Sequence, residues 1–146
     1  MKKPSKKHYE DQNDAFEKFK QFILPRLEGL KGVKEARVWG SLARGEFGLY
    51  SKEYLGQAGS DVDLIVLLEE GARMPTSWKR MLEKTWFDGY YDRSQNKRYR
   101  KFEYGGTIHK VDLLVVKNSE ILRARERLNG ETKGVYLKKG SKGELK

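Results

Sequence analysis

Two short apolar segments that contain aspartate restrict this chain more than any other feature. Residues 61–68 are DVDLIVLL and residues 108–116 are IHKVDLLVV. Runs of β-branched residues and leucine of this length, closed by polar or glycine-containing turns, predict buried strands. Because aspartate is depleted in strands, an acid inside each of the two most apolar strands needs a reason. Either the aspartates have a function, or Asp61 marks only a strand edge and Asp63 is partly exposed.

The spacing of the aspartates favours a function, although Asp-x-Asp alone is common. Residues two apart on a strand project from the same face, about 6.6 Å apart, so Asp61 and Asp63 are expected side by side while Val62 enters the core. Two ionised carboxylates repel each other and need a compensating cation. Oxygen ligands suit Mg²⁺, which takes its remaining ligands from water and substrate phosphates. If the two strands pair, Asp112 can reach the same metals.

A glycine-serine turn precedes these strands. The predicted strand in residues 33–40, VKEARVWG, ends with Val38 and Trp39. Gly40 and Ser41 form the turn, and a short helix begins at Leu42. Backbone N–H groups and the serine hydroxyl of such a turn can bind phosphate oxygens, and glycine lets the phosphate approach closely. Arg44, one turn into the helix, could add a positive charge. A turn of this kind is, by itself, more often only a turn.

The wider pattern predicts one α+β domain, in which a mixed sheet carries helices on one face. We expect a basic, disordered arm at residues 1–12, the folded domain at 13–130 and a basic tail at 131–146. Residues 45–60 contain four glycines and no clear period, which indicates a loop. A helix is expected from Asn13 or Asp14, and Pro25 kinks it or ends it early. Two further helices are expected over 78–88 and over 119–128, and the second stops at Asn129-Gly130. Strands are expected over 98–104 and 107–116, joined at Gly105-Gly106, and an edge strand at 135–137.

The net charge of +10, from 31 Lys and Arg against 21 Asp and Glu, favours a polyanionic substrate or partner, although excess lysine can also serve solubility. Basic and aromatic side chains alternate between Trp78 and Lys101, most densely at residues 97–101, and the tail adds lysines at 138–142. Nucleic-acid contacts use this mixture, because charges follow phosphates and rings stack on bases. Trp86 and Phe87 are expected to face the core instead.

Two absences restrict the setting of the protein. The chain contains no cysteine, which excludes disulfides and thiolate metal sites. No apolar run approaches ~20 residues, so no membrane-spanning helix is expected. Both observations fit a cytoplasmic protein.

Together, the segments VWGSLARGE, GSDVDLIVL and KVDLLVV resemble the signature of the DNA polymerase beta-like nucleotidyltransferase superfamily. The combination is most similar to the minimal nucleotidyltransferases, which are stand-alone catalytic domains, and it covers residues 33–117. The resemblance implies a palm-like fold. It also implies transfer of a nucleoside monophosphate from a nucleoside triphosphate such as ATP to a hydroxyl, with release of pyrophosphate. Two Mg²⁺ ions, or Mn²⁺ in their place, would be the cofactors.

The resemblance also implies a role for each residue that matches the signature. Asp61 and Asp63 correspond to ligands of both metals. Asp112 corresponds to a ligand of the metal that activates the acceptor hydroxyl. Gly40 and Ser41 correspond to the residues that hold the β- and γ-phosphates of the nucleotide.

Other positions leave the acceptor and the partner open. Arg44 matches a frequent basic position of the family. The 19 residues between Ser41 and Asp61 are more than is usual in the family, and they form either a surface insertion or a partner-binding lobe. The acceptor could be a nucleic-acid 3′ end, a protein hydroxyl or a small molecule, and a minimal nucleotidyltransferase can act as an antitoxin that nucleotidylates its partner. The alternative is a non-catalytic nucleic-acid-binding or antitoxin-like partner-binding module on the same fold.

Overall fold

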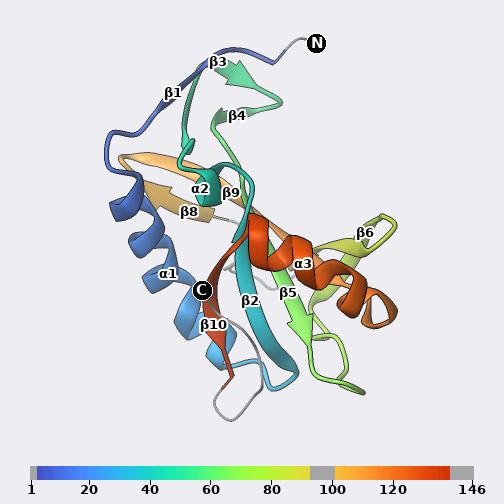
Figure 1. Cartoon of the computed structure of the whole chain (residues 1–146). Coiled ribbons are helices and arrows are strands. Elements are labelled where there is room, and N and C mark those ends of the chain that lie inside the picture. Colours follow the sequence, from blue (N-terminus) through green and yellow to red (C-terminus); the bar gives the residue numbers. More distant parts are fainter. Residues whose placement is uncertain (1–2, 93–100, 139–146) are drawn as a thin grey trace.

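The computed structural model describes residues 3–92 and 101–138, and these ranges form an α+β fold with a mixed sheet, as predicted (Figure 1). The helical elements are α1 (Gln12–Glu28), α2 (Ser41–Arg44), the 3₁₀ turn η1 (Asn118–Glu120) and α3 (Ile121–Glu131). The strands are β1 (Lys6–His8), β2 (Val33–Trp39), β3 (Gly48–Tyr54), β4 (Gln57–Gly59), β5 (Val62–Leu68), β6 (Trp78–Glu83), β7 (Phe87–Asp92), β8 (Lys101–Tyr104), β9 (Thr107–Val116) and β10 (Lys133–Leu137).

The main sheet has the strand order β10-β2-β5-β9-β7-β6, and β8 pairs with the first residues of β9 across Gly105-Gly106. β5 and β9 run parallel, whereas the other pairs within the described part of this sheet are antiparallel. The predicted strands at 33–40, 61–68 and 107–116 are confirmed as β2, β5 and β9. The two strands that carry the aspartates are therefore neighbours at the centre of the sheet.

Helices cover both faces of the sheet, so the prediction of helices on one face is wrong. α1 packs Ile23 on the face that carries Leu64, and α3 packs Leu128 on the face that carries Ile65. Figure 1 shows α3 crossing in front of β2 and β5, and α1 well separated from α3. Alternate residues of a strand point to opposite faces, and β5 is apolar on both because both are covered. A continuous apolar run does not reveal which face each helix takes.

The first helix starts slightly earlier than predicted. Asp11 caps α1, rather than Asn13 or Asp14, and its carboxylate accepts a hydrogen bond from the Asp14 N–H at 2.8 Å. Pro25 lies inside the helix and does not end it early. The apolar residues at helical spacing in the sequence, which predict one buried stripe, are buried in α1, and they are Phe16, Phe19, Ile23 and Leu27.

The helix predicted over residues 78–88 is wrong, because this segment forms the β6–β7 hairpin. The Lys84 N–H donates to the Phe87 carbonyl at 2.9 Å and closes the turn. β7 then pairs along the second half of β9. The edge of β9 offers a ladder of hydrogen bonds. This tertiary pairing overrides the local signal of Pro75, Thr76 and Ser77, which are typical of a helix start.

The arm and the loop predicted at 45–60 contain a small antiparallel sheet, β1-β3-β4, at one end of the molecule (Figure 1). β3 and β4 connect through Leu55 and Gly56, whose φ angles of 51° and 79° form a two-residue turn of the I′ type. Leucine rarely adopts positive φ, so this turn is hard to predict. β1 pairs closely with β3, since a Cβ on Gly48 would lie 2.0 Å from the Lys7 carbonyl oxygen.

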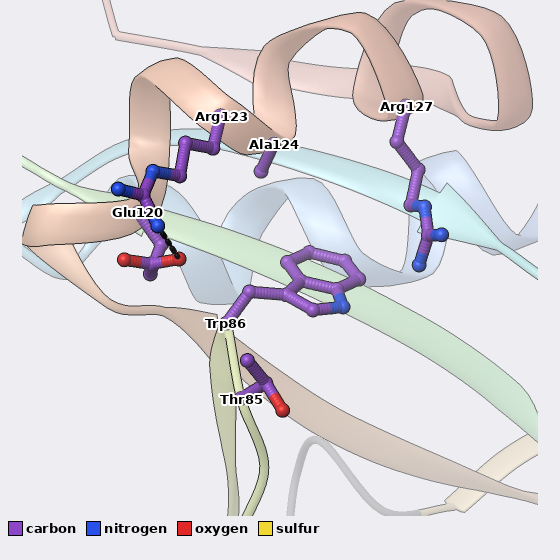
Figure 2. Close-up of a pocket in the computed structure, with 6 residues that line it drawn as sticks. All are labelled: Thr85, Trp86, Glu120, Arg123, Ala124 and Arg127. Carbon is purple, nitrogen blue, oxygen red and sulfur yellow. Dashed lines mark ion pairs between the residues drawn. The ribbon is translucent and has the colours of Figure 1, made fainter.

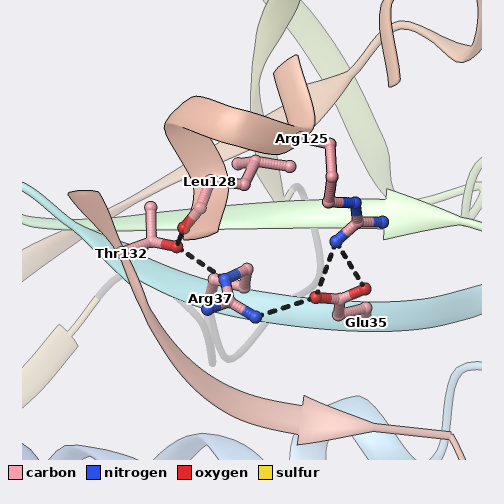
Figure 3. Close-up of polar contacts among 5 residues, drawn as sticks. All are labelled: Glu35, Arg37, Arg125, Leu128 and Thr132. Atoms are coloured by element: carbon pink, nitrogen blue, oxygen red, sulfur yellow. Dashed lines mark hydrogen bonds and ion pairs between the residues drawn. The ribbon is translucent and has the colours of Figure 1, made fainter. Parts of the chain in front are cut away.

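A buried ion-pair network fixes α3 to β2 (Figure 3). The side chains of Glu35 and Arg37 are fully buried and pair at 3.0 Å, and Arg125 of α3 reaches Glu35 at 3.4 Å. Thr132, directly after α3, accepts a hydrogen bond from Arg37. Because these contacts hold its last turn, α3 runs past the predicted stop at Asn129-Gly130.

The C-terminal edge strand predicted at 135–137 is confirmed as β10, which pairs with β2. The start of the strand predicted at 98–104, the basic cluster at 97–100 and the tail lysines after Lys138 lie outside the described residues. Over the ranges that the structure covers, no helix is both long and apolar enough to cross a membrane.

Candidate metal and phosphate site

Asp63 and Asp112 lie side by side on the two parallel strands. They are direct partners in the register of β5 and β9, so their side chains project from the same face across one strand spacing of about 4.8 Å. Asp61 lies one residue before β5, and its carboxyl is close enough to that of Asp112 for the two to influence each other's protonation. The structure therefore brings the three predicted acids together, although Asp112 is distant from the other two in sequence.

The turn between β2 and α2 lies directly against these acids. A Cβ atom on Gly40 would lie 2.6 Å from Asp63 Oδ2, and Gly40 has a φ of 79°. Glycine alone meets both conditions without strain. The contact follows from the register, because Trp39, the preceding residue, pairs with Asp63. The predicted phosphate turn and the predicted metal ligands thus form one site.

A chain of polar contacts fixes the backbone just before Asp61. The Ser41 hydroxyl, which is buried, donates to the Ser60 hydroxyl at 3.5 Å. His109 Nδ1 lies 2.8 Å from the Ser60 carbonyl oxygen, and His109 Nε2 lies 2.8 Å from the Tyr9 hydroxyl. His109 is fully buried, and burial lowers its pKa. Both ring nitrogens of His109 are therefore engaged within the protein.

Burial and mutual repulsion raise the pKa of two of the acids. Burial, followed by the charge of Asp112 and the hydrogen bond with it, raises the pKa of Asp61 to about 7. Burial and the charge of Asp112 raise the pKa of Asp63 to about 6, while the positive charge of Arg44 acts in the opposite direction. Carboxyls crowded in this way hold protons near neutral pH, and a cation would displace those protons.

Lys110 belongs to the site but was not predicted. Its ammonium lies 3.5 Å from Asp112 Oδ1, and its charge opposes the rise in the pKa of Asp61. Lys110 and Asp112 are two apart on β9, so the period-two rule that joined Asp61 and Asp63 would also have found this pair. The ammonium partly neutralises the acids and stands where an anionic substrate would approach.

The three acids offer the oxygen ligands that Mg²⁺ prefers. In the part of the chain that the structure describes, no three His, Cys, Asp or Glu side chains form a ready-made metal-binding group. However, Asp61 Oδ1 is buried and has no hydrogen-bond partner among the described residues. A buried carboxylate oxygen without a partner costs free energy, and a bound cation would satisfy it. The residues therefore fit a hard divalent cation.

Arg44 lies beside the turn, but its side chain pairs with Glu46 at 3.0 Å. The Arg44 side chain is 57% exposed, and with Lys133 it lines a cavity of about 540 Å³ that shares Trp39 with the acidic site. An exposed ion pair of this kind is weak. The guanidinium can therefore exchange its carboxylate partner for a phosphate oxygen.

An apolar cavity of about 350 Å³ opens beside Asp63 and Asp112. Trp39 forms part of it, and the β6–β7 hairpin supplies further walls, which are Met81, Leu82, Phe87, Gly89 and Tyr90. Met81 and Leu82 are 56% and 43% exposed, which is high for large apolar side chains. The sequence does not predict that these residues line a cavity together with the acids, because residues 78–88 are expected to form a helix.

Comparisons with known proteins identify no relative of this chain. No family model matches the sequence, and neither a curated protein nor a solved structure matches it. Membership of the nucleotidyltransferase superfamily therefore stays a prediction from the motifs. The function has to be inferred from the acids, the glycine turn and the cavity.

Proposed function

We propose that this chain is a metal-dependent nucleotidyltransferase. It moves a nucleoside monophosphate from a nucleoside triphosphate to a hydroxyl acceptor and releases pyrophosphate. One observation carries the proposal: Asp61, Asp63 and Asp112 meet at neighbouring parallel strands, directly beside the turn at Gly40. This arrangement offers cation ligands and a close approach for phosphate at one place. We propose accordingly that the sheet is a palm-like nucleotidyltransferase fold.

In the proposed reaction, the acceptor oxygen forms a bond to the α-phosphorus while the bond from this phosphorus to the bridging oxygen of the β-phosphate breaks. The products are the nucleotidylated acceptor, pyrophosphate and the proton of the hydroxyl. Asp61, Asp63 and Asp112 would hold two Mg²⁺ ions, whose chemistry would be charge neutralisation of the triphosphate and activation of the hydroxyl. Gly40 and Ser41 orient the β- and γ-phosphates.

The apolar cavity beside the acids suits the nucleoside. Its volume of about 350 Å³ falls in the range of small-molecule sites. Trp39, Phe87 and Tyr90 offer aromatic rings to a base, and Lys110 lines the same cavity near the acids. Aromatic rings stack on every base, so we expect only a weak preference among the four nucleotides.

Transfer of a label tests this function. The protein is incubated with Mg²⁺, a cell extract and a nucleoside triphosphate labelled on either the α- or the γ-phosphate. We expect the α-label to become attached to an acceptor and the γ-label to appear in pyrophosphate, and nuclease or protease treatment then identifies the acceptor class. Attachment of the γ-label would indicate a kinase-type reaction instead. An Asp112→Asn variant that transfers the α-label as fast as the wild type would exclude this site.

A non-catalytic binding module for nucleic acid or for an antitoxin-type partner is the second candidate. The ion pair of Lys110 with Asp112 favours it, because an ammonium can supply the positive charge that a metal would bring. Lys110→Met separates the two candidates. If Lys110 is a permanent counter-ion, the variant melts at a lower temperature and Mg²⁺ does not restore it. If the acids bind metal, Mg²⁺ restores the melting temperature of the variant.

A further inference from the structure

A second cavity, of about 240 Å³, combines one aromatic ring with two guanidinium groups (Figure 2). Trp86 comes from the turn between β6 and β7, and Arg123 and Arg127 of α3 lie on either side of its ring (Figure 2). The remaining lining residues are Thr85, Glu120 and Ala124. Trp86 was predicted to face the core. Its half-buried ring does pack at the margin of the core, but it also lines this cavity.

Both guanidinium groups can accept an anion. The side chains of Arg123 and Arg127 are 83% and 52% exposed. Their carboxylate partners are Glu120 at 3.9 Å and Glu131 at 3.1 Å, and exposed ion pairs of this kind are weak enough to be exchanged. The guanidinium carbon of Arg127 lies 5.6 Å from the centre of the Trp86 ring, a cation–π contact that keeps the charge beside the ring.

We propose that this cavity binds single-stranded nucleic acid, with one base against Trp86 and the adjoining phosphates on Arg123 and Arg127. Rings beside cations bind single strands, because every base has a face that stacks and every linkage carries a negative charge. The net charge of +10 favours a polyanion. An acidic protein would engage the arginines but would leave the indole without a planar partner.

The position of the cavity identifies the acceptor. The Trp86 ring centre lies 5.6 Å from that of Trp39 and 4.8 Å from that of Phe87. Both of these rings line the apolar cavity that contains Asp63 and Asp112. A strand on Trp86 can therefore end at the rim of that cavity and present its terminal hydroxyl to the acids, while Trp39 and Phe87 stay free for the incoming nucleoside. This step rests on the proposed nucleotidyl transfer, and it makes the acceptor the 3′ end of RNA or DNA.

Fluorescence anisotropy of short labelled RNA and DNA strands, without divalent metal or triphosphate, measures strand binding separately from metal-dependent nucleotide binding. For Arg123→Ala/Arg127→Ala, the slope of log Kd against log salt is expected to fall by about 1.4, at about 0.7 per phosphate contact. Trp86→Leu is expected to weaken binding about 5- to 150-fold without changing the slope. The control Lys18→Ala/Arg73→Ala also removes two exposed charges, and we expect it to keep the wild-type slope.

Further measurements keep this inference separate from the proposed enzymatic activity. Arg123→Glu reverses a charge on a side chain that is 83% exposed, so it tests the cavity with the fold intact, and we expect it to weaken strand binding. Calorimetry with Mg²⁺ and triphosphate is expected to give wild-type affinity for the cavity variants. If strands bind but triphosphate does not, the transferase function fails and the strand site stands. Equal losses from the cavity pair and the control pair, or no binding of either polymer by the wild type at low salt, would overturn the inference.

Discussion

Among single residues, Gly40 is the position where backbone strain has to be distinguished from an effect on the acidic site. Gly40 and Gly56 share a φ of 79°, but a Cβ on Gly40 would lie 2.6 Å from Asp63 Oδ2, whereas a Cβ on Gly56 meets no atom within 4 Å. Alanine at Gly56 costs about 1–2 kcal/mol in backbone strain. Gly40 combines its φ with a ψ of −146°, a region that is essentially restricted to glycine, so alanine there costs up to about 3 kcal/mol. Only Gly40→Ala also displaces the Asp63 carboxylate.

We therefore predict a larger loss of stability for Gly40→Ala than for Gly56→Ala in urea unfolding. In calorimetry, metal-dependent triphosphate affinity should fall roughly 10- to 100-fold for Gly40→Ala alone, the range seen when the support of a metal ligand is removed. If both variants bind triphosphate equally well, Gly40 serves only the backbone conformation of the turn.

The raised pKa values of Asp61 and Asp63 predict a pH dependence of stability. Their folded-state pKa values, about 7 and about 6, exceed the ordinary value of 3.8, so the folded protein holds protons that the unfolded chain releases. The contribution of these protons to the free energy of unfolding is fully present below pH 3.8 and is lost as the pH rises through the folded-state pKa values. At about pH 8, the metal-free site therefore destabilises the fold.

We predict that Asp61→Asn/Asp63→Asn raises the melting temperature of the metal-free protein by about 3 °C near pH 8, because it removes the repulsion, and by less near pH 5. Mg²⁺ should raise the melting temperature of the wild type at the higher pH and leave that of the variant unchanged. A constant difference between the two proteins across this pH range would contradict the assigned protonation of the site.

At the scale of elements, the network between β2 and α3 predicts a non-additive mutation series. The side chains of Glu35 and Arg37 are fully buried. Arg37→Met leaves the Glu35 carboxylate under-compensated and should cost about 3–5 kcal/mol in urea unfolding. Glu35→Leu/Arg37→Met removes both charges and should cost less than the single change. The control is removal of the exposed ion pair between Arg127 and Glu131, which should lower the free energy of unfolding by less than about 1 kcal/mol.

Elements with a local apolar period could be predicted, whereas elements decided by distant pairing could not. The stripe of α1 and the apolar runs of β2, β5 and β9 carry the periods of their structures. The segment after Pro75-Thr76-Ser77 resembles a helix start, but the edge of β9 makes it a hairpin. The β3–β4 hairpin turns at Leu55, a residue type that gives no turn signal.

At the scale of the whole molecule, the site combines segments whose proximity only the fold reveals. The three acids could be predicted, because their spacing and apolar surroundings are local properties. Lys110 could be predicted as well, because residues two apart on a strand project from the same face. The walls of the apolar cavity could not be predicted, because β6–β7 lies beside the acids only through its pairing with β9. The cavity at Trp86 depends in addition on α3 packing over the same face of the sheet.

Calorimetric titration of a nucleoside triphosphate, with Mg²⁺ and with a chelator, tests most directly whether the three acids form a metal-dependent nucleotide site. We predict binding by the wild type with Mg²⁺ and a loss of affinity of at least about tenfold with the chelator, since the acids alone repel the triphosphate. Asp63→Asn should bind weakly under both conditions. Glu17→Gln, which removes an exposed acid on α1, should behave as the wild type does. Equal affinity of the wild type with and without Mg²⁺ would contradict a role for Asp61, Asp63 and Asp112 as metal ligands.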